Sequence, residues 1–488
     1  MASLTLLLFA CDVNTPVQKS AVSINSRAFF TVFQEGPGAP FESRLIGQNN
    51  TTYRPISISF TVPKPDSPYT VVFVCPSKGV KPHEVYVFYA TPAEMNTINF
   101  TCKRAQDEIL LRPIYGKISG VTLPTVDSPV AEKARIAFSR DSQIDGWEGF
   151  ATKVRAGQRD IIALKGAQAA SGDIDPSTLY INRGVSQGIS EDSVEIDVDF
   201  TGADNKAFLA DFDAANASTV NISGAAAGET IISKVGFVTT NKSYLELAAS
   251  SQSSYSFIPV PLGRFQGAVA NFTNKAEFNP GEGHELVAEI DGSDGLPQRK
   301  VYKYFTESIG ETHNVVIPRA LPSQPVVGVR GKSKYQEVIL NWNAYNDSAA
   351  GNTLLYRWTL QGGKAEPSAD YPDESNIGEA RWILQVTPGW AKAVNGSSSN
   401  FSIVLPTSFT VTGTVDKRPP WHEEWAFKSA ADIEWEFSAV EVKSRFTAEA
   451  VVEHFLNGNF DILSKDSSGA YNPNDFEFGE VLARGVAR

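Results

Sequence analysis

The chain has few of the residues that form metal centres, with five histidines and three cysteines among 488 residues. The histidines are scattered, and neither a His-Glu-x-x-His string nor another pair at helical ligand spacing occurs. Zinc sites need three or four histidine, cysteine or carboxylate ligands, usually at short spacing. The sequence therefore offers no ligand set for a zinc hydrolase.

Long apolar runs and basic clusters are missing as well. No segment approaches the 18 or so consecutive apolar residues that a membrane-spanning helix needs. The formal net charge is -12, and no cluster of Lys and Arg forms a stripe that could follow phosphates. We therefore expect neither a transmembrane helix nor a nucleic-acid partner. Such acidity usually means no more than solubility, and the alternatives are cation binding and electrostatic steering.

Catalytic strings are also scarce. Gly184-Val-Ser-Gln-Gly188 fits the Gly-x-Ser-x-Gly nucleophile elbow, which requires a strand, a sharp turn and then a helix. The segment Val194-Glu-Ile-Asp-Val-Asp-Phe200 that follows alternates with period two and predicts a strand instead. We therefore interpret Ser186 as a turn serine and expect a non-enzymatic protein.

The residues that are abundant are typical of β-sandwiches. The 37 Gly and 28 Pro separate short runs of Val, Ile, Thr, Phe and Tyr, which predicts many strands joined by turns. The length exceeds what one core usually supports, so we predict an all-β chain of tandem antiparallel, immunoglobulin-like sandwiches. The predicted segments are a signal remnant (1–11), four sandwiches (12–108, 109–203, 204–318 and 319–446), and a short helix with a polar tail (447–488).

Helices are expected at two places. The segment from Ala207 to Ala215 predicts a short helix at the start of the third sandwich. Near the C-terminus, Thr447 can cap a helix that Asn457-Gly458 ends. The tail beyond it is polar, and we predict that it is irregular.

The N-terminus contains an apolar run that ends in Leu8-Phe9-Ala10-Cys11 before the polar residue Asp12. This pattern resembles the lipobox of bacterial lipoproteins, although no Lys or Arg precedes the run and the run is short. The resemblance implies that Cys11 is acylated and anchors an exported protein to a membrane, in the periplasm or at the cell surface. The alternative is a short buried β-strand.

The other two cysteines, Cys75 and Cys102, each lie in a strand-like run and could pair. A disulfide closing a loop of this length would stabilise the fold by roughly 3–4 kcal/mol in an oxidising compartment. Two unpaired buried thiols are the alternative.

Two of the predicted sandwiches resemble known modules. The Gly-x-Ile-x-Gly strand in Ile114-Tyr-Gly-Lys-Ile-Ser-Gly-Val121 is similar to the opening of carboxypeptidase-regulatory-like, transthyretin-like sandwiches. Val338-Ile-Leu-Asn-Trp342 and Leu354-Leu-Tyr-Arg-Trp-Thr-Leu360 resemble early strands of a fibronectin type III-like domain. The first resemblance implies a structural or binding module without a catalytic residue. The second implies that an inward Trp on one strand packs against an alternating strand across the core.

Seven of the eight tryptophans lie between Trp342 and Trp435, and two flank acidic residues in Trp421-His-Glu-Glu-Trp425. Sugar rings stack on exposed aromatic side chains, and carboxylates accept hydrogen bonds from hydroxyl groups. This loop is therefore a candidate glycan site with Trp421, Trp425, Glu423 and Glu424. The favoured alternative is that the tryptophans fill the core of a large sandwich.

Two acidic segments have the oxygen-rich, glycine-bent character that calcium favours. They contain Asp197 and Asp199, and Asp291 and Asp294. Neither completes a known calcium loop, so solvated turns are the alternative. No other cofactor is expected.

The leading hypothesis is a non-enzymatic envelope or cell-surface lipoprotein with binding, adhesive or structural modules. It predicts a membrane partner through the lipid anchor, and a glycan or another surface protein as a second partner. The alternatives are a glycan-binding protein or polysaccharide hydrolase, and a structural subunit of a filament, surface layer or virus particle.

Overall fold

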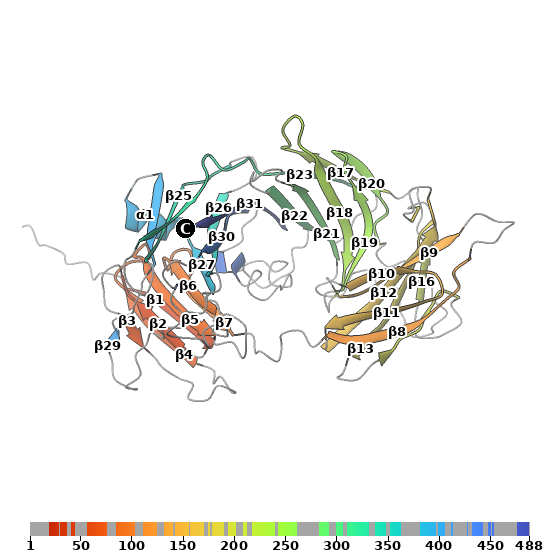
Figure 1. Cartoon of the computed structure of the whole chain (residues 1–488), viewed down its shortest axis with the longest axis horizontal. Coiled ribbons are helices and arrows are strands. Elements are labelled where there is room, and N and C mark those ends of the chain that lie inside the picture. Colours follow the sequence, from red (N-terminus) through yellow and green to blue (C-terminus); the bar gives the residue numbers. More distant parts are fainter. Residues whose placement is uncertain are drawn as a thin grey trace, which may run out of the picture.

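Figure 1 shows the computed structural model of the whole chain. The structure describes residues 19–28, 30–36, 41–43, 56–75, 84–102, 111–123, 131–139, 142–155, 157–169, 174–175, 178–189, 194–201, 208–211, 217–239, 243–260, 283–291, 299–305, 310–330, 337–347, 352–362, 381–396, 399–405, 411–412, 427, 432–442, 448–449, 451–452 and 476–487. These residues form β-sheets almost throughout, so the all-β prediction is confirmed. No helix among them is long and apolar enough to cross a membrane.

The first sandwich has two sheets. Strand β1 pairs antiparallel with β4 and parallel with β7, and the second sheet has the order β3-β2-β5-β6. Aromatic and aliphatic side chains fill the space between the sheets, with Phe73 stacked on Phe100 at 4.3 Å between ring centroids. The strands are β1 (Ser20–Arg27), β2 (Phe30–Gln34), β3 (Phe41–Ser43), β4 (Ile56–Val62), β5 (Tyr69–Cys75), β6 (Glu84–Ala90) and β7 (Thr97–Thr101).

The second sandwich repeats this topology. Its first strand, β8, pairs antiparallel with β11 and parallel with β14, and the other sheet has the order β10-β9-β12-β13, extended by β16. The strands are β8 (Leu111–Ser119), β9 (Glu132–Ser139), β10 (Ser142–Gly146), β11 (Gly149–Arg155), β12 (Gly157–Ala167), β13 (Tyr180–Ile189), β14 (Val194–Glu195), β15 (Val198–Asp199) and β16 (Phe208–Asp211).

The third sandwich has the same topology again. Strand β17 pairs antiparallel with β20 and parallel with β23, opposite a sheet of order β19-β18-β21-β22. The strands are β17 (Ser218–Ser223), β18 (Ile231–Val238), β19 (Tyr244–Ser250), β20 (Ser254–Phe257), β21 (Gly283–Ile290), β22 (Arg299–Phe305) and β23 (Thr312–Val316). It packs on the second sandwich, where Arg135 Nη1 lies 3.2 Å from Glu246 Oε1.

The C-terminal region differs from these three sandwiches. A small sheet of order β24-β25-β28 faces the strands β26, β27 and β30, and α1 lies beside it (Figure 1). Its elements are β24 (Val326–Arg330), β25 (Glu337–Asn343), β26 (Asn352–Gly362), β27 (Arg381–Val386), α1 (Pro388–Asn395), β28 (Asn400–Val404), β29 (Val411–Thr412), β30 (Ile433–Val442) and β31 (Phe476–Ala487).

One 13-stranded sheet joins three of the predicted units. Its order is β19-β18-β21-β22-β31-β30-β26-β27-β6-β5-β2-β3-β29. Strand β27 pairs parallel with β6, and β31 pairs antiparallel with both β22 and β30. Strand β5 is buried on both faces because Phe73 enters the core of the first sandwich while Val72 and Val74 enter the C-terminal core. Backbone hydrogen bonds in this sheet thus connect three of the predicted sandwiches.

Three local predictions are wrong, and one helix was not expected. Ser186, interpreted as a turn serine, lies instead within β13. The expected helix from Ala207 to Ala215 is wrong at Phe208–Asp211, which forms β16 on the edge of β13. The expected irregular tail is wrong at Phe476–Ala487, because this segment forms β31, which pairs antiparallel with both β22 and β30. Helix α1 was not expected, although Thr387 caps it and Pro388 begins it. The described residues 448–449 and 451–452 are helical, as predicted near the C-terminus.

Candidate functional site

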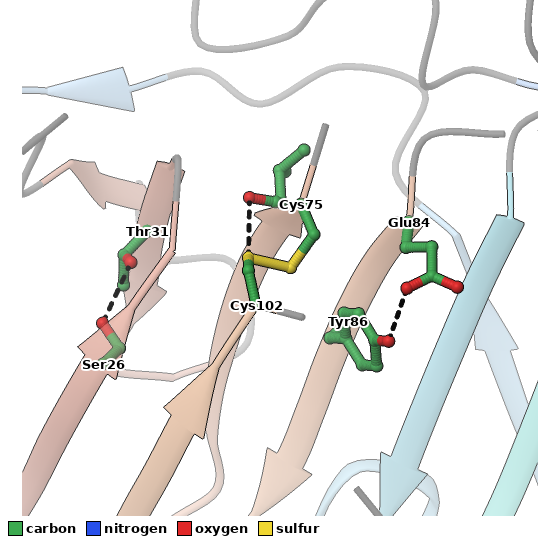
Figure 2. Close-up of a disulfide and its surroundings, with 7 residues drawn as sticks. Ser26, Thr31, Cys75, Glu84, Tyr86 and Cys102 are labelled. Atoms are coloured by element: carbon green, nitrogen blue, oxygen red, sulfur yellow. Dashed lines mark hydrogen bonds between the residues drawn. A yellow bond between two sulfur atoms is a disulfide. The ribbon is translucent and has the colours of Figure 1, made fainter. Parts of the chain in front are cut away.

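The disulfide between Cys75 and Cys102 is the covalent feature of the first sandwich (Figure 2). Cys75 ends β5 and Cys102 directly follows β7, so the bond links the two facing sheets. The Cα atoms are 5.5 Å apart, and both side chains are buried. The predicted pairing is confirmed, and the alternative of two free thiols is wrong.

Polar side chains near the disulfide are paired within the same sandwich. Tyr86 Oη donates a hydrogen bond of 2.6 Å to Glu84 Oε2, and the hydroxyls of Ser26 and Thr31 lie 3.5 Å apart (Figure 2). Glu84 also lies 3.1 Å from Arg381 Nη1 of β27. The disulfide is therefore close to the place where the first sandwich joins the C-terminal strands.

Several predicted site residues lie outside the described residues. Cys11, the predicted lipid anchor, is one of them. The predicted glycan loop with Trp421, Glu423, Glu424 and Trp425 lies outside them too, as does Asp294. The roles proposed for these residues therefore stay predictions.

The described tryptophans of the C-terminal region are core residues. Trp342, Trp358, Trp382 and Trp390 are buried, and Trp435 packs against the same core. Trp342 lies 5.9 Å from Trp358 and 5.6 Å from Phe401 between ring centroids. These five tryptophans therefore lie in the core, as the favoured alternative predicts.

Two of the aspartates predicted for calcium accept hydrogen bonds from backbone N–H groups. Asp197 Oδ1 accepts from the Lys117 backbone N–H at 2.8 Å, and Asp199 Oδ1 accepts from the Thr201 backbone N–H at 2.9 Å. Asp291 is exposed at the end of β21. Within the described part of the chain, no group of three or more His, Cys, Asp or Glu side chains is placed to hold a metal. Calcium at these aspartates stays a prediction.

Two histidines share the core of the third sandwich. His284 of β21 is buried and stacks on Phe305 at 5.2 Å, while His313 of β23 stacks on the same ring at 3.9 Å. His284 Nε2 accepts a 2.9 Å hydrogen bond from the Val260 backbone N–H, which requires that nitrogen to be unprotonated. Burial lowers the pKa of His284 to about 3 and that of His313 to about 4. Both are therefore neutral at pH 7.

The outer sheets of the first and third sandwiches carry the same row of hydrogen-bonded side chains. Ser57 Oγ donates to Asn25 Oδ1 at 2.7 Å, and Asn25 Nδ2 donates to Asn99 Oδ1 at 3.1 Å. The equivalent bonds in the third sandwich run from Ser254 to Asn221 at 2.8 Å and from Asn221 to Asn314 at 3.1 Å. We call these two sets the polar rows.

The polar rows were not among the sequence predictions, although the sequence contains a signal for them. Ser57-Ile-Ser-Phe60 and Ser254-Tyr-Ser-Phe257 share the pattern Ser-x-Ser-Phe, and both asparagines of the last strands follow a Thr-x dipeptide. Each segment is only four or five residues long, so the match is recognisable only after the strand registers align them.

Comparison with known proteins gives little further information. No protein-family model and no curated protein matches the chain. The tip fimbrial protein Mfa3 from Porphyromonas gingivalis is 12% identical over 40% of this chain and 83% of its own, with a TM-score of 0.13. A Streptococcal ancillary pilin is 9% identical over 62% and 98%, with a TM-score of 0.14. E. coli alpha-2-macroglobulin is 10% identical over 86% and 31%, with a TM-score of 0.10. Similarities at these scores carry no functional argument.

Proposed function

We propose that this chain is an exported, non-enzymatic protein of the cell envelope or surface that serves as an adhesive or structural module. The disulfide between Cys75 and Cys102 carries the proposal, because structural disulfides form and persist in oxidising compartments. The absence of catalytic strings in the sequence supports the non-enzymatic part.

The continuous 13-stranded sheet supports a structural role. Strands from residues 30–90, 231–305 and 352–487 hydrogen-bond into one sheet, so a force applied to one part passes through strand ladders to the next. Sandwiches connected only by linkers would instead move relative to one another. A continuous body of this kind suits a protein that holds another molecule at a distance from its attachment point.

The attachment point in this proposal is Cys11. Acylation of its thiol would make the membrane a partner and leave the sandwiches to meet a glycan or another surface protein. One acyl chain alone binds a membrane only marginally, so stable anchoring needs more than one chain.

The test expresses the natural gene in its own host and follows palmitate incorporation, membrane fractionation and thiol alkylation. We expect Cys11-dependent labelling, lost in Cys11→Ala, and alkylation of Cys75 and Cys102 only after reduction. Without labelling, the lipid anchor is wrong but an exported module remains. Free thiols at Cys75 and Cys102 together with a cytosolic protein would overturn the whole proposal.

A further inference from the structure

A second row of small polar side chains lies beside each polar row, two residues further along each strand. Its members are hydroxyl residues that are exposed or half-buried. In the register of the outer sheets, these rows consist of Ser59, Ser23 and Thr97 in the first sandwich and of Ser256, Thr219 and Thr312 in the third. We call these two sets the hydroxyl rows, and each hydroxyl row together with its polar row a polar face.

The two polar faces match position by position, although the cores beneath them do not. The residue type is the same at five of the six positions, and the sixth is Ser in one face and Thr in the other. The buried side chains on either side of the last asparagine differ, with Ile98 and Phe100 in the first sandwich and His313 and Val315 in the third. Packing restricts buried positions more than exposed ones. An exposed pattern that repeats over two different cores therefore indicates a role for the exposed side chains themselves.

The second sandwich shows that the shared topology does not require this face. Its Phe200 backbone N–H donates to the Ser119 carbonyl at 2.9 Å, as Cys102 and Ile317 donate in the other two sandwiches. Counted from this bond, the positions of the central and last asparagines carry charged residues, Lys117 and Asp197. The remaining four positions carry Gly149, Ala151, Tyr115 and Glu195. Strand pairing alone thus does not explain the polar faces.

Hydrogen bonds within each polar row fix the direction of the amide groups. Because Asn25 Nδ2 donates to Asn99 Oδ1, the Nδ2 group of Asn99 is left for a partner outside the row. The same order runs from Asn221 to Asn314. Neither face contains a charged side chain, and Arg27 lies in the next row of β1. Each face therefore presents oriented, uncharged donors and acceptors.

We propose that each polar face binds an uncharged polysaccharide. Sugar hydroxyls donate and accept hydrogen bonds at the same time, as amide and hydroxyl side chains do. The net charge of -12 would repel an anionic polymer. A polymer repeats the same chemistry along its length, so two matching faces gain avidity that offsets the weak binding of each open site. The inference rests on the adhesive role proposed above, and its site is separate from the predicted glycan loop at residues 421–425.

The first test is sedimentation of the full-length protein with insoluble cellulose, starch, mannan or chitin. Calcium alginate is the anionic comparison. We expect saturable binding to at least one of the four uncharged polymers, with equal strength at low and high salt because no ion pair contributes. Failure to bind any of the four, or binding to alginate alone, overturns the proposal.

Two substitutions separate ligand binding from strand register. Asn99→Asp and Asn314→Asp keep the Oδ1 acceptor that each polar row uses and replace the Nδ2 donor with a charged oxygen. We expect each to lower the apparent affinity at least about tenfold, because one of two faces is lost, and both together to abolish binding. The thermal unfolding midpoint should stay that of the wild type. Asn341→Asp, the same change at an exposed position of β25, is the matched control and should bind normally.

Two further outcomes would overturn the proposal. If the double variant binds as the wild type does, the polysaccharide binds elsewhere on the chain. If ultracentrifugation shows self-association that the double variant loses, the polar faces join copies of this chain. Either result is distinguishable from failure of the proposed function. An exported, Cys11-labelled protein that binds no polysaccharide loses only this inference, whereas a cytosolic protein with free thiols that binds one loses only the proposed location and role.

Discussion

The first and third sandwiches have the same strand topology, but different interactions fix the end of the last strand in each. In both, the residue after the last strand donates its backbone N–H to the first strand, from Cys102 to Arg27 and from Ile317 to Ser223, each at 2.8 Å. Cys102 forms the disulfide, whereas Ile317 is buried in an apolar core. At this shared position, a disulfide therefore stabilises the first sandwich and hydrophobic burial stabilises the third.

The cores differ at a second equivalent position. Ile98 and His313 each precede the last asparagine of a polar row, and both are buried. Isoleucine places no titrating group at this position of the first sandwich, whereas His313 and its neighbour His284 place two histidines in the core of the third sandwich. Both sandwiches keep the same exposed row, so topology and row are shared while the means of stabilisation are not.

The largest expected difference between the two sandwiches appears in acid. The histidine pKa values of about 3 and about 4 in the folded state lie below the unfolded value of about 6.5, so the unfolded state binds more protons. Their contribution is complete above pH 6.5 and is lost as pH falls toward 4 and then 3, by several kcal/mol in total. Hydrogen exchange at pH 7 and pH 4 should show loss of protection in β21 and β23 before β5 and β7.

His313→Phe sharpens this expectation. The variant removes one titrating group from a ring stack, so the difference in protection between pH 7 and pH 4 should become smaller in the third sandwich. An unchanged acid response in His313→Phe would mean that other groups govern the pH dependence.

Reduction should affect the first sandwich and the neighbouring strands β26 and β27 more than the third sandwich. The disulfide closes a loop with a sequence separation of 27, for which the chain-entropy relation gives about 3–4 kcal/mol. We expect Cys75→Ser/Cys102→Ser to lower the unfolding free energy of the first sandwich by about this amount, as measured by urea unfolding. Because β5 and β6 also contribute to the C-terminal core, the amides of β26 and β27 should lose protection from hydrogen exchange as well. If only the third sandwich lost protection from hydrogen exchange, the disulfide would not be what stabilises the first sandwich.

The sequence was sufficient for those features that depend on short segments. Strand periodicity, turn residues and cysteine placement predicted the all-β fold and the disulfide. Pairing between distant segments was not predictable, because β6 with β27 and β22 with β31 are joined by backbone hydrogen bonds that do not depend on a particular side chain. His284 and His313 show the same limit, since nothing in either local sequence indicates that both stack on the ring of Phe305.

A smaller effect is expected from Glu449, which ties the C-terminal helical segment to the first sandwich. Its Oε1 accepts hydrogen bonds from the backbone N–H groups of Asn96 at 2.7 Å and Thr97 at 2.6 Å. Hydrogen bonds to a charged group contribute about 1.5–3 kcal/mol, and partial exposure reduces this figure, so we expect Glu449→Ala to cost about 1–2 kcal/mol. Urea unfolding measures it, and Glu436→Ala, in an exposed ion pair, is the control.

The smallest expected effect concerns what the two sandwiches share. Asn25→Ala and Asn221→Ala each remove two exposed side-chain hydrogen bonds, so each should cost about 0.5–1 kcal/mol. If the polar rows only hold the strand register, the two costs should be equal, and double-mutant cycles with Asn99→Ala and Asn314→Ala should give equal coupling energies. A clear coupling in one sandwich with none in the other would show that the rows are not equivalent, and that the shared topology does not extend to how the outer sheets are held together.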